Sequence, residues 1–415
     1  MASSPIYQKL TALLNERGAE VEKWFADQYA LSIPHYNVSV DVRHSGYKIA
    51  PVDTNLFPAG FNLLQGDSRT RAVEETKKYF RRYLENVKDV VLIPENHTRN
   101  LYYLENVYSL HSILKDAGLN VRIGGLAVTE KTELQTQSGK TITVEPLSRE
   151  GSVLYVGADK KFIPEIVVMN NDLSSGSPDI LKNIDPMILP GIGFGWYRRR
   201  KTEHFEVYNQ LVQRFSQQFN FDPWLISTSF FRCGEINFKD RTGIECVAIT
   251  VDKAIHALKQ KYAEHGITGE PYVFVKANSG TYGMGIMTAR SGQDVIEINK
   301  KDRNKMNVIK EGTQNTDVII QEGVPTVDTI DGKVAEPMLY LIGGTPVGCN
   351  YRVNQNRDAF SNLNSEGMTF KSACDADNET QDADSVGSSC PVLGFIARLA
   401  ALAATQECYE PRWDI

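Results

Sequence analysis

A lysine stands directly before a glycine-rich loop in the second half of the chain, and this arrangement suits the binding of a nucleoside triphosphate. An apolar, β-branched run that starts at Val273 ends on Lys276, and a second apolar run starts at Ile286. The pattern predicts a strand, a loop and a second strand. Glycines let backbone N–H groups approach phosphate oxygens closely, and the lysine adds a positive charge. The loop residues that we expect at the phosphates are Ser279, Gly280, Gly283 and Gly285.

This loop differs from two common phosphate-binding motifs. No Gly-Lys-Ser/Thr follows it and no helix is expected after it, so it is not a Walker A motif. The lysine precedes the loop and a strand follows it, so it is not the dinucleotide-binding glycine motif either. A tight β-hairpin without any ligand would show the same local pattern. The residues farther along the chain therefore decide between the two interpretations.

Polar residues stand at the ends of three further segments downstream of the loop. A buried-type strand leads into Gln321 and Glu322. A hairpin follows, with Glu336 on its first strand and Arg352 on its second. A polar loop rich in amides and hydroxyls, residues 360–367, comes last.

This order of features resembles the ATP-grasp superfamily, in which two α+β lobes hold ATP between them. The resemblance implies that the Gln-Glu segment reads the adenine edge and that its backbone forms the hinge. It also implies that the glycine loop covers the phosphates, that Glu336 lies near the ribose or the lysine, and that Arg352 lies near the transferred phosphoryl group. The catalytic residues on this resemblance are Lys276 and Arg352, and the ATP-binding residues are Lys276, Ser279, Gly280, Gly283, Gly285, Gln321, Glu322, Val324, Glu336, Ser361 and Asn362.

The expected metal site is found near the start of the chain. Comparable ATP-grasp enzymes hold Mg²⁺ with an acid and a later Glu-x-Asn segment, but no Glu-x-Asn follows the polar loop here. Upstream, Asp41 lies in one strand candidate, and Asp53 and Asn55 lie on one face of the next, before a Pro-Ala-Gly turn. Two carboxylates and an amide oxygen suit Mg²⁺. We therefore predict a metal site in this hairpin and a circularly permuted chain. An ordinary hairpin is the alternative, since Asp, Asn and Pro are favoured in turns.

A second resemblance extends over essentially the whole chain. The segments 48–62, 94–100 and 168–173, together with the loop at Lys276, look like the proteobacterial-type glutamate–cysteine ligases. Such enzymes join the γ-carboxyl of glutamate to the amine of cysteine with ATP and Mg²⁺, the first step of glutathione biosynthesis. The resemblance implies these substrates. The sequence departs from the wider superfamily at Asp53, where a glutamate is usual.

Strand and helix patterns alternate in the first half of the chain, which predicts a largely parallel sheet. Ligands bind at the carboxyl ends of such strands. The candidate substrate-binding residues chosen by this rule, together with two arginines that could pair with substrate carboxylates, are Arg69, Asn96, His97, Arg99, Asn170 and Asn171. Surface arginines without a ligand are the alternative for the two arginines. For His97 we favour a hydrogen-bonding role over that of a base.

The predicted fold is a combination of α/β and α+β parts, with two ATP-grasp-like lobes around ATP and an α/β lobe on the substrate side. We place the N-terminal helix and metal hairpin in 1–60 and the substrate-side lobe in 61–200. The lobe with the glycine loop is expected in 201–325, and the core lobe with a C-terminal helix in 326–415.

Composition excludes several classes of protein. The chain has 415 residues, 41% of them hydrophobic and 23% charged, which is ordinary for a globular protein. The net charge of −6 argues against a nucleic-acid partner. No apolar run is long enough to span a membrane and no export signal is visible, so we expect a cytoplasmic enzyme acting on small molecules. The six cysteines show no metal-binding spacing and are expected to be reduced.

Two points stay open from the sequence. The chain could be another ATP-grasp carboxylate–amine ligase, such as a glutathione synthetase or a peptide-tail glutamate ligase, or a nucleotide-binding module without turnover. The basic cluster 198–201 could be a solvated helix start or a contact with an anion.

Overall fold

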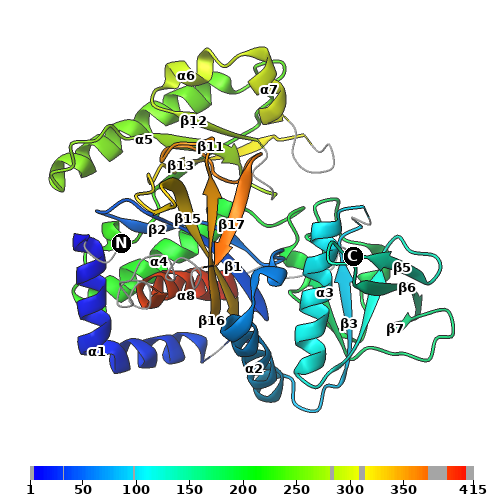
Figure 1. Ribbon diagram of the computed structural model, residues 1–415. Coiled ribbons are helices and arrows are strands. Elements are labelled where there is room, and N and C mark those ends of the chain that lie inside the picture. The colour runs from blue at the N-terminus through cyan, green and yellow to red at the C-terminus, as the bar shows by residue number, and fades with distance from the viewer. Residues whose placement is uncertain are drawn as a thin grey trace.

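The computed structural model describes residues 4–30, 32–96, 99–280, 285–307, 314–372 and 390–407. The chain is a mixed α/β protein with three β-sheets (Figure 1). No helix among these residues is both long and apolar enough to cross a membrane. The predicted mixture of α/β and α+β parts is confirmed, whereas the boundaries at 60, 200 and 325 stay predictions.

The central sheet joins strands from the two ends of the chain. Its order is β17-β16-β15-β1-β2, with β14 also paired to β15. Strand β1 is antiparallel to both of its neighbours, with Val40 opposite Leu339 on one side and Asp41 opposite Asp53 on the other. The N-terminal hairpin is thus built into the C-terminal one. The strands are β1 (Asn37–His44), β2 (Ile49–Asn55), β14 (Thr329–Ile330), β15 (Lys333–Ile342), β16 (Thr345–Asn354) and β17 (Met368–Ser372).

Helices cover both faces of this central sheet. The alternation of side chains sends Val40 and Leu339 to one face, where they pack with Phe395 and Leu399 of the apolar helix α8. Tyr340 and its alternate neighbours pack on the other face against α2. Helices α1 and α4 lie against α8 (Figure 1). The bounds are α1 (Pro5–Tyr29), α2 (Gly66–Tyr83), α4 (Lys201–Phe219) and α8 (Cys390–Gln406).

A four-stranded antiparallel sheet carries the glycine-rich loop. Its order is β10-β13-β11-β12, and the predicted strand–loop–strand is confirmed because Lys276 of β11 pairs with Ile286 of β12. Val273 and Val275 face the core beneath α5, whereas Phe274 and Lys276 face the opposite way, toward the central sheet. The elements are β10 (Phe230–Gly234), α5 (Ile244–Glu264), β11 (Val273–Ala277), β12 (Ile286–Ala289), α6 (Gly292–Ile296), α7 (Lys300–Asn307) and β13 (Asp317–Glu322).

The third sheet contains the predicted parallel strands. Its order is β5-β6-β4-β3-β8-β9, with β7 paired to β6, and β3 is parallel to both β4 and β8. Because Pro94 pairs with Asn170, the carboxyl ends of β3 and β8 are adjacent. The elements are β3 (Asp89–Pro94), α3 (Leu101–Asp116), β4 (Asn120–Gly125), β5 (Thr132–Gln135), β6 (Thr141–Glu150), β7 (Val153–Val156), β8 (Ile166–Asn170) and β9 (Met187–Leu189). Short 3₁₀ turns are η1 (Phe61–Leu63), η2 (Asp179–Leu181), η3 (Ile192–Phe194) and η4 (Pro223–Leu225).

Candidate active site

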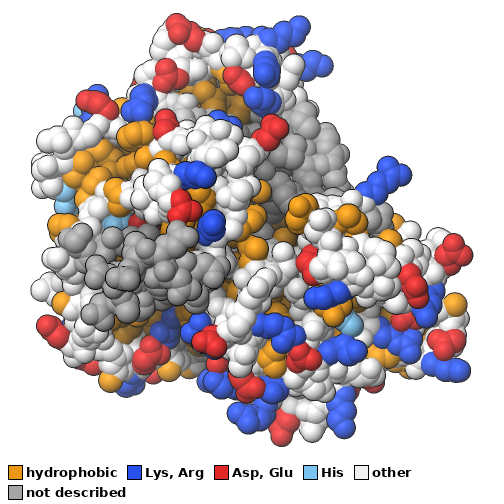
Figure 2. Space-filling model, viewed as in Figure 1, with side chains coloured by type: hydrophobic (Ala, Val, Ile, Leu, Met, Phe, Trp, Pro, Cys, Tyr) orange, Lys and Arg blue, Asp and Glu red, His pale blue; other side chains and the backbone are white. Residues whose placement is uncertain are grey.

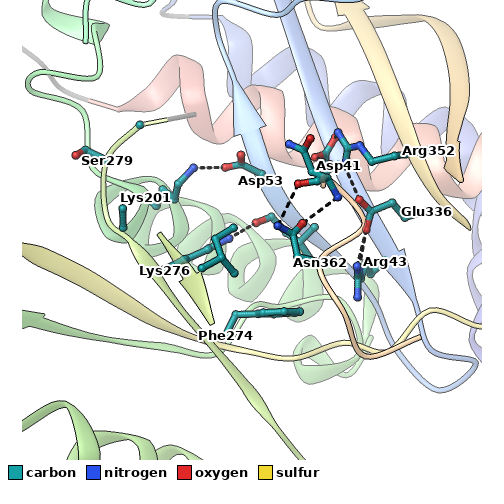
Figure 3. Close-up of a pocket in the computed structure, with 15 residues that line it drawn as sticks. Asp41, Arg43, Asp53, Lys201, Phe274, Lys276, Ser279, Glu336, Arg352 and Asn362 are labelled. Atoms are coloured by element: carbon teal, nitrogen blue, oxygen red, sulfur yellow. Dashed lines mark hydrogen bonds and ion pairs between the residues drawn. The ribbon is translucent and has the colours of Figure 1, made fainter. Parts of the chain in front are cut away.

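A cavity lies between the central sheet and the four-stranded sheet, and charged side chains from both sheets line it (Figure 3). It encloses about 640 Å³, including the part open to solvent, which is within the range of small-molecule sites. The lining residues are Asp41, Arg43, Val52, Asp53, Lys201, Phe274, Lys276, Ala277, Ser279, Gly280, Ile286, Glu336, Arg352, Asn362 and Asn364. Residues that are more than 200 positions apart in the sequence thus meet in one place.

Lys276 reaches across the cavity from β11 to the central sheet. Its Nζ donates to the carbonyl of Val52 on β2 at 2.7 Å (Figure 3). Burial, together with the positive charge of Lys201, lowers the pKa of Lys276 to about 8, although the negative charge of Asp53 opposes this shift. A lysine with this pKa is still mainly protonated at neutral pH and can bind a phosphate.

Lys201 forms an ion pair with Asp53 at 2.5 Å. Burial alone would raise the pKa of Asp53, but Lys201 and Lys276 outweigh it and lower the pKa to about 2. The basic cluster that contains Lys201 is therefore not a solvated helix start, because Arg199 and Lys201 are both buried. The alternative in which this cluster meets an anion fits the position of Lys201 at the cavity.

Arg352 of β16 lies between two carboxylates. Its guanidinium is 3.0 Å from Asp41 and also donates to Glu336 (Figure 3). Burial and the neighbouring Glu336 raise the pKa of Asp41, although Arg352 opposes this shift. Burial also favours protonation of Glu336, but Arg43 and Arg352 outweigh it and lower the pKa of that carboxyl. The site therefore holds one carboxylate that is firmly ionised beside one that is less so.

Arg43 is a cavity residue that sequence reasoning missed. Its Nε donates to Glu336 at 2.7 Å, and its Nη2 donates to the carbonyl of Ser361 at 2.7 Å. Its Nη1 reaches the carbonyl of Val324 at 3.4 Å. The available signal was its position two residues after Asp41, which places both side chains on one face of β1. Arg43 joins the polar loop and the segment after β13 to the central sheet.

Two described residues of the glycine-rich loop belong to the cavity wall. Ser279 and Gly280 line it, and Gly280 and Gly285 have φ values of +92° and +60°. An L-residue with a side chain is strained in this backbone region, which explains the glycines. Gly283 lies outside the described residues.

The side chains of the two residues predicted to bind adenine point to opposite faces of strand β13. Gln321 is buried on the face of β13 that it shares with Phe274 across the strand pair, and neither polar atom of its side chain has a hydrogen-bond partner among the described residues. Glu322 points the other way and pairs with the fully buried Lys48 at 2.8 Å. The side chain of Gln321 is therefore available to a ligand, whereas the side chain of Glu322 is occupied.

The polar loop contributes two amides. Asn362, which was predicted, and Asn364, which was not, both line the cavity. Asn362 accepts a hydrogen bond from the backbone N–H of Asn364 at 3.0 Å, so the loop fixes its own shape. Ser361 does not line the cavity, and it contributes its carbonyl to Arg43.

The structure brings together two of the three predicted metal ligands. Asp41 and Asp53 are directly opposite on neighbouring strands and line the cavity with Glu336. Asn55 does not line it, because its side chain accepts a hydrogen bond from the backbone of Phe57 at 2.9 Å and fixes the following turn. Among the described residues, no group of three or more His, Cys, Asp or Glu is arranged to enclose a metal. Mg²⁺ is commonly held by one or two carboxylates together with substrate phosphates, and Asp41 and Asp53 fit that arrangement.

The predicted substrate-binding residues do not line this cavity. Asn170 and Asn171 are buried and bonded to neighbouring groups, and Asn171 donates to the carbonyl of Pro94. Arg69 pairs with Asp116 at the surface, and Asn96 and Arg99 are exposed. His97 lies outside the described residues. The rule for parallel sheets thus located a group of strand ends, but the described side chains chosen there contact neighbouring groups or are exposed, and they do not line the cavity.

Charge is distributed evenly over the face of the molecule seen in Figure 2. Basic and acidic side chains alternate there without a large patch of either sign. The concentration of charge inside the cavity therefore distinguishes it from this surface.

Comparisons with known proteins agree with the geometry. A family model described as glutamate-cysteine ligase (GshA) matches residues 12–408. Among solved structures, the chain is similar to the "Putative gamma-glutamylcysteine synthetase" of Methylobacillus flagellatus KT, with 39% identity and a TM-score of 0.88 over 98% of this chain and 97% of that one. A glutathione synthetase-like effector (GSS30) of Globodera pallida shares 11% identity with a TM-score of 0.38 over 89% and 82% of the two chains, too little to support an argument. No match was found among curated proteins.

Proposed function

Because the chain belongs to the glutamate-cysteine ligase family, we propose that it joins the γ-carboxyl of L-glutamate to the amine of L-cysteine with hydrolysis of ATP to ADP and phosphate. This would be the first step of glutathione biosynthesis. The observation that carries the proposal is the meeting of Lys276, Lys201 and Arg352 with Asp41 and Asp53 in one cavity between two sheets. Cations suited to phosphates and carboxylates suited to a divalent metal are needed together for phosphoryl transfer.

In the first step of this proposal, an oxygen of the γ-carboxylate attacks the γ-phosphorus of ATP. The bond from that phosphorus to the bridging oxygen breaks, and ADP leaves. Negative charge spreads over the transferring group, so a fixed guanidinium and ammonium beside it lower the barrier. In this proposal Arg352 and Lys276 supply these charges, which is supported by the contacts of Arg352 with Asp41 and Glu336 and by the position of Lys276 across the cavity from Arg352.

In the second step, the amine of cysteine attacks the acyl carbon, phosphate leaves, and the nitrogen loses a proton. Water would destroy the acyl phosphate, so the site must exclude it. In this proposal the glycine-rich loop between β11 and β12 would cover the site, which is supported by Ser279 and Gly280 lining the cavity.

Mg²⁺ belongs to the same proposal. When bound, it would neutralise charge on the phosphates. Asp41 and Asp53 would hold it, because both line the cavity and both offer carboxylate oxygens. The pKa of Asp53, about 2, keeps that carboxylate ionised at any physiological pH.

We further infer an ATP-grasp-like arrangement in which the metal-binding strands have moved to the start of the chain. The support is the pairing of β1 with β15, which inserts an N-terminal hairpin into a C-terminal sheet. Lys276 and the glycine loop lie on the other, four-stranded sheet across the cavity.

The direct test measures ADP formation by the purified protein with ATP, Mg²⁺ and glutamate, with and without cysteine. We expect turnover only when both amino acids are present. Parallel reactions with γ-glutamylcysteine plus glycine, and with glutamate alone as both donor and acceptor, separate the activity from other carboxylate–amine ligases. Turnover with one of these pairs and none with glutamate plus cysteine would refute the proposal.

The acyl phosphate has its own test. Hydroxylamine replaces cysteine as the nucleophile, and the expected product from glutamate and ATP is the γ-hydroxamate together with ADP. Absence of hydroxamate from an enzyme that is active with cysteine would exclude an intermediate accessible to the added nucleophile.

A further inference from the structure

A buried arginine holds strand β2 next to Asp53. Arg199 is 1% exposed, and its Nη1 donates to the carbonyl of Thr54 at 2.7 Å. Strand β2 is at the end of the strand order, so it has only β1 as a neighbour in the described sheet. A carbonyl on the free side of such a strand needs another donor when it is buried. Arg199 supplies that donor one residue beyond the proposed metal ligand.

Glu407 in turn fixes Arg199. The two side chains form a fork of two hydrogen bonds, each 2.8 Å long, and both side chains are 1% exposed. Glu407 directly follows α8, and its second interaction is with Nδ1 of His204 at 2.6 Å. A planar guanidinium held by two bonds to one carboxylate has little freedom to rotate. The direction of its bond to Thr54 is therefore set by the residue that follows helix α8.

The neighbouring carbonyl of β2 is held differently. Val52 accepts its hydrogen bond from Lys276, which we assign to the phosphates of ATP. A bound phosphate would compete for this lysine, whereas nothing in the cavity competes for Arg199, which does not line it. The bond from Arg199 is thus the fixed support of the strand on one side of Asp53, and the bond from Lys276 is the variable one on the other side.

We propose that Glu407 is a positioning residue for the ligase reaction: through Arg199 and the Thr54 carbonyl it holds β2 so that the Asp53 carboxylate stays directed at the metal and phosphate site. The inference rests on the proposed role of Asp53. Groups that orient a metal ligand typically change metal affinity or activity by about 10–100-fold when they are removed.

The experiment compares Glu407→Gln with the unaltered full-length protein. Glutamine keeps the shape of the side chain but weakens its hold on the guanidinium. We expect kcat to fall about 10–100-fold, while KM for ATP changes less than kcat. Binding of Mn²⁺ in the presence of a non-hydrolysable ATP analogue, followed by electron paramagnetic resonance without turnover, should weaken about 10-fold or more.

A matched control is available on the same helix. Arg398 of α8 forms a similar fork with Glu22 of α1, but this pair is partly exposed and does not contact β2. Glu22→Gln should leave kcat and Mn²⁺ affinity unchanged. Arg199→Lys is the second variant, because it keeps the buried charge but loses the fork. It should move kcat and Mn²⁺ affinity in the same direction as Glu407→Gln.

The outcomes separate this inference from the assignment of Asp53. If Asp53→Asn weakens Mn²⁺ binding but Glu407→Gln and Arg199→Lys only lower the melting temperature, the positioning role is refuted and the metal site stands. If Asp53→Asn leaves Mn²⁺ binding unchanged, the metal assignment itself fails. If Glu407→Gln does not fold, Arg199→Lys decides by the same measurements.

Discussion

Two groups of polar residues in this protein meet the same sequence criterion of lying on or beyond strands, yet their side chains differ in what they can bind. Around the cavity, Lys276, Arg352 and Asp53 are charged and line one space between two sheets, where Asp53 pairs with Lys201 and Arg352 pairs with Asp41. At the ends of the parallel strands β3 and β8, Asn170 accepts from Tyr103 and Asn106 and donates to the carbonyl of Pro58.

The two groups differ less in their position on strands than in whether their side chains can still bind a ligand. The side-chain amide of Asn170 makes its hydrogen bonds to neighbouring elements of the fold. These bonds hold the turn after β2 against α3 and β8. The charged cavity residues form ion pairs with one another. An anionic ligand or a metal ion can replace one partner of such a pair. Four changes would break or sharpen this contrast.

Removal of the charge at Lys276 should have the largest effect. We expect Lys276→Met to lower kcat/KM for ATP by about 10²–10³-fold, since one fixed charge is lost from the transition state. Steady-state kinetics with ATP as the varied substrate provides the measurement. Lys259→Met is the control, because that lysine is exposed on α5 and pairs with Glu270. An effect of less than threefold at Lys276 would place the phosphates elsewhere.

The dependence of kcat/KM on pH should show a smaller effect of Lys276. The pKa of Lys276 is about 8, so kcat/KM should fall about tenfold per pH unit above that value as the ammonium loses its proton. Arg352 does not contribute, because its pKa is raised further above an already high value.

The substitution Lys276→Arg should remove this fall in kcat/KM or move it to higher pH. The stability of the folded protein should change in the opposite sense. Between about pH 8 and 10 the unfolded chain holds the proton that the folded chain has released, so this group's contribution to the free energy of unfolding rises with pH. A profile that stays flat to pH 10 would contradict a buried phosphate-binding lysine.

Asn170→Ala should act on stability and hardly on chemistry. The change leaves the amide of Asn106 and the carbonyl of Pro58 without their partner, and we expect the free energy of unfolding to fall by about 1–3 kcal/mol. Urea unfolding measures this change, and kcat at 15 °C measures the folded enzyme. A large rise in KM for glutamate at unchanged stability would restore Asn170 as a substrate ligand.

Arg69→Ala should give the smallest effect. Its ion pair with Asp116 is about half exposed on both sides, and such pairs contribute about 0–1 kcal/mol. We expect kcat and the KM for glutamate to stay within about twofold of the unaltered enzyme, since exposed pairs far from the cavity rarely matter. A tenfold rise in the KM for glutamate would show that Arg69 turns away from Asp116 to bind substrate.

Sequence reasoning located the cavity through local patterns that have a known physical cause. Gly280 and Gly285 have positive φ values, which favour glycine, and Asp41 and Asp53 lie on two consecutive strand-like segments, so both features are visible in the sequence. Arg43 was missed, and Lys201 was named only within a basic cluster that could contact an anion, because their partners are 293 and 148 residues away in the sequence. No local pattern reports such a partner.

The same limit explains the substrate residues. A largely parallel sheet was predicted from apolar runs alternating with helices, and β3 and β8 are a parallel pair within it. The contacts of each side chain at the strand ends depend on the packing of α3 and of the turn near Pro58. The local sequence around Asn170 and Asn171 does not encode this packing.

The insertion of β1 between β2 and β15 also has a consequence for synthesis of the protein. The hairpin leaves the ribosome roughly 280 residues before its partner strand, which corresponds to roughly 15–60 s at usual elongation rates. Throughout that interval Val38, Val40 and Val42, all fully covered in the finished fold, have neither β15 nor α8 beside them. A nascent β-branched strand with an unpaired edge is prone to join other chains. The growing polypeptide therefore exposes an unpaired, β-branched strand until the strand that completes the cavity has emerged.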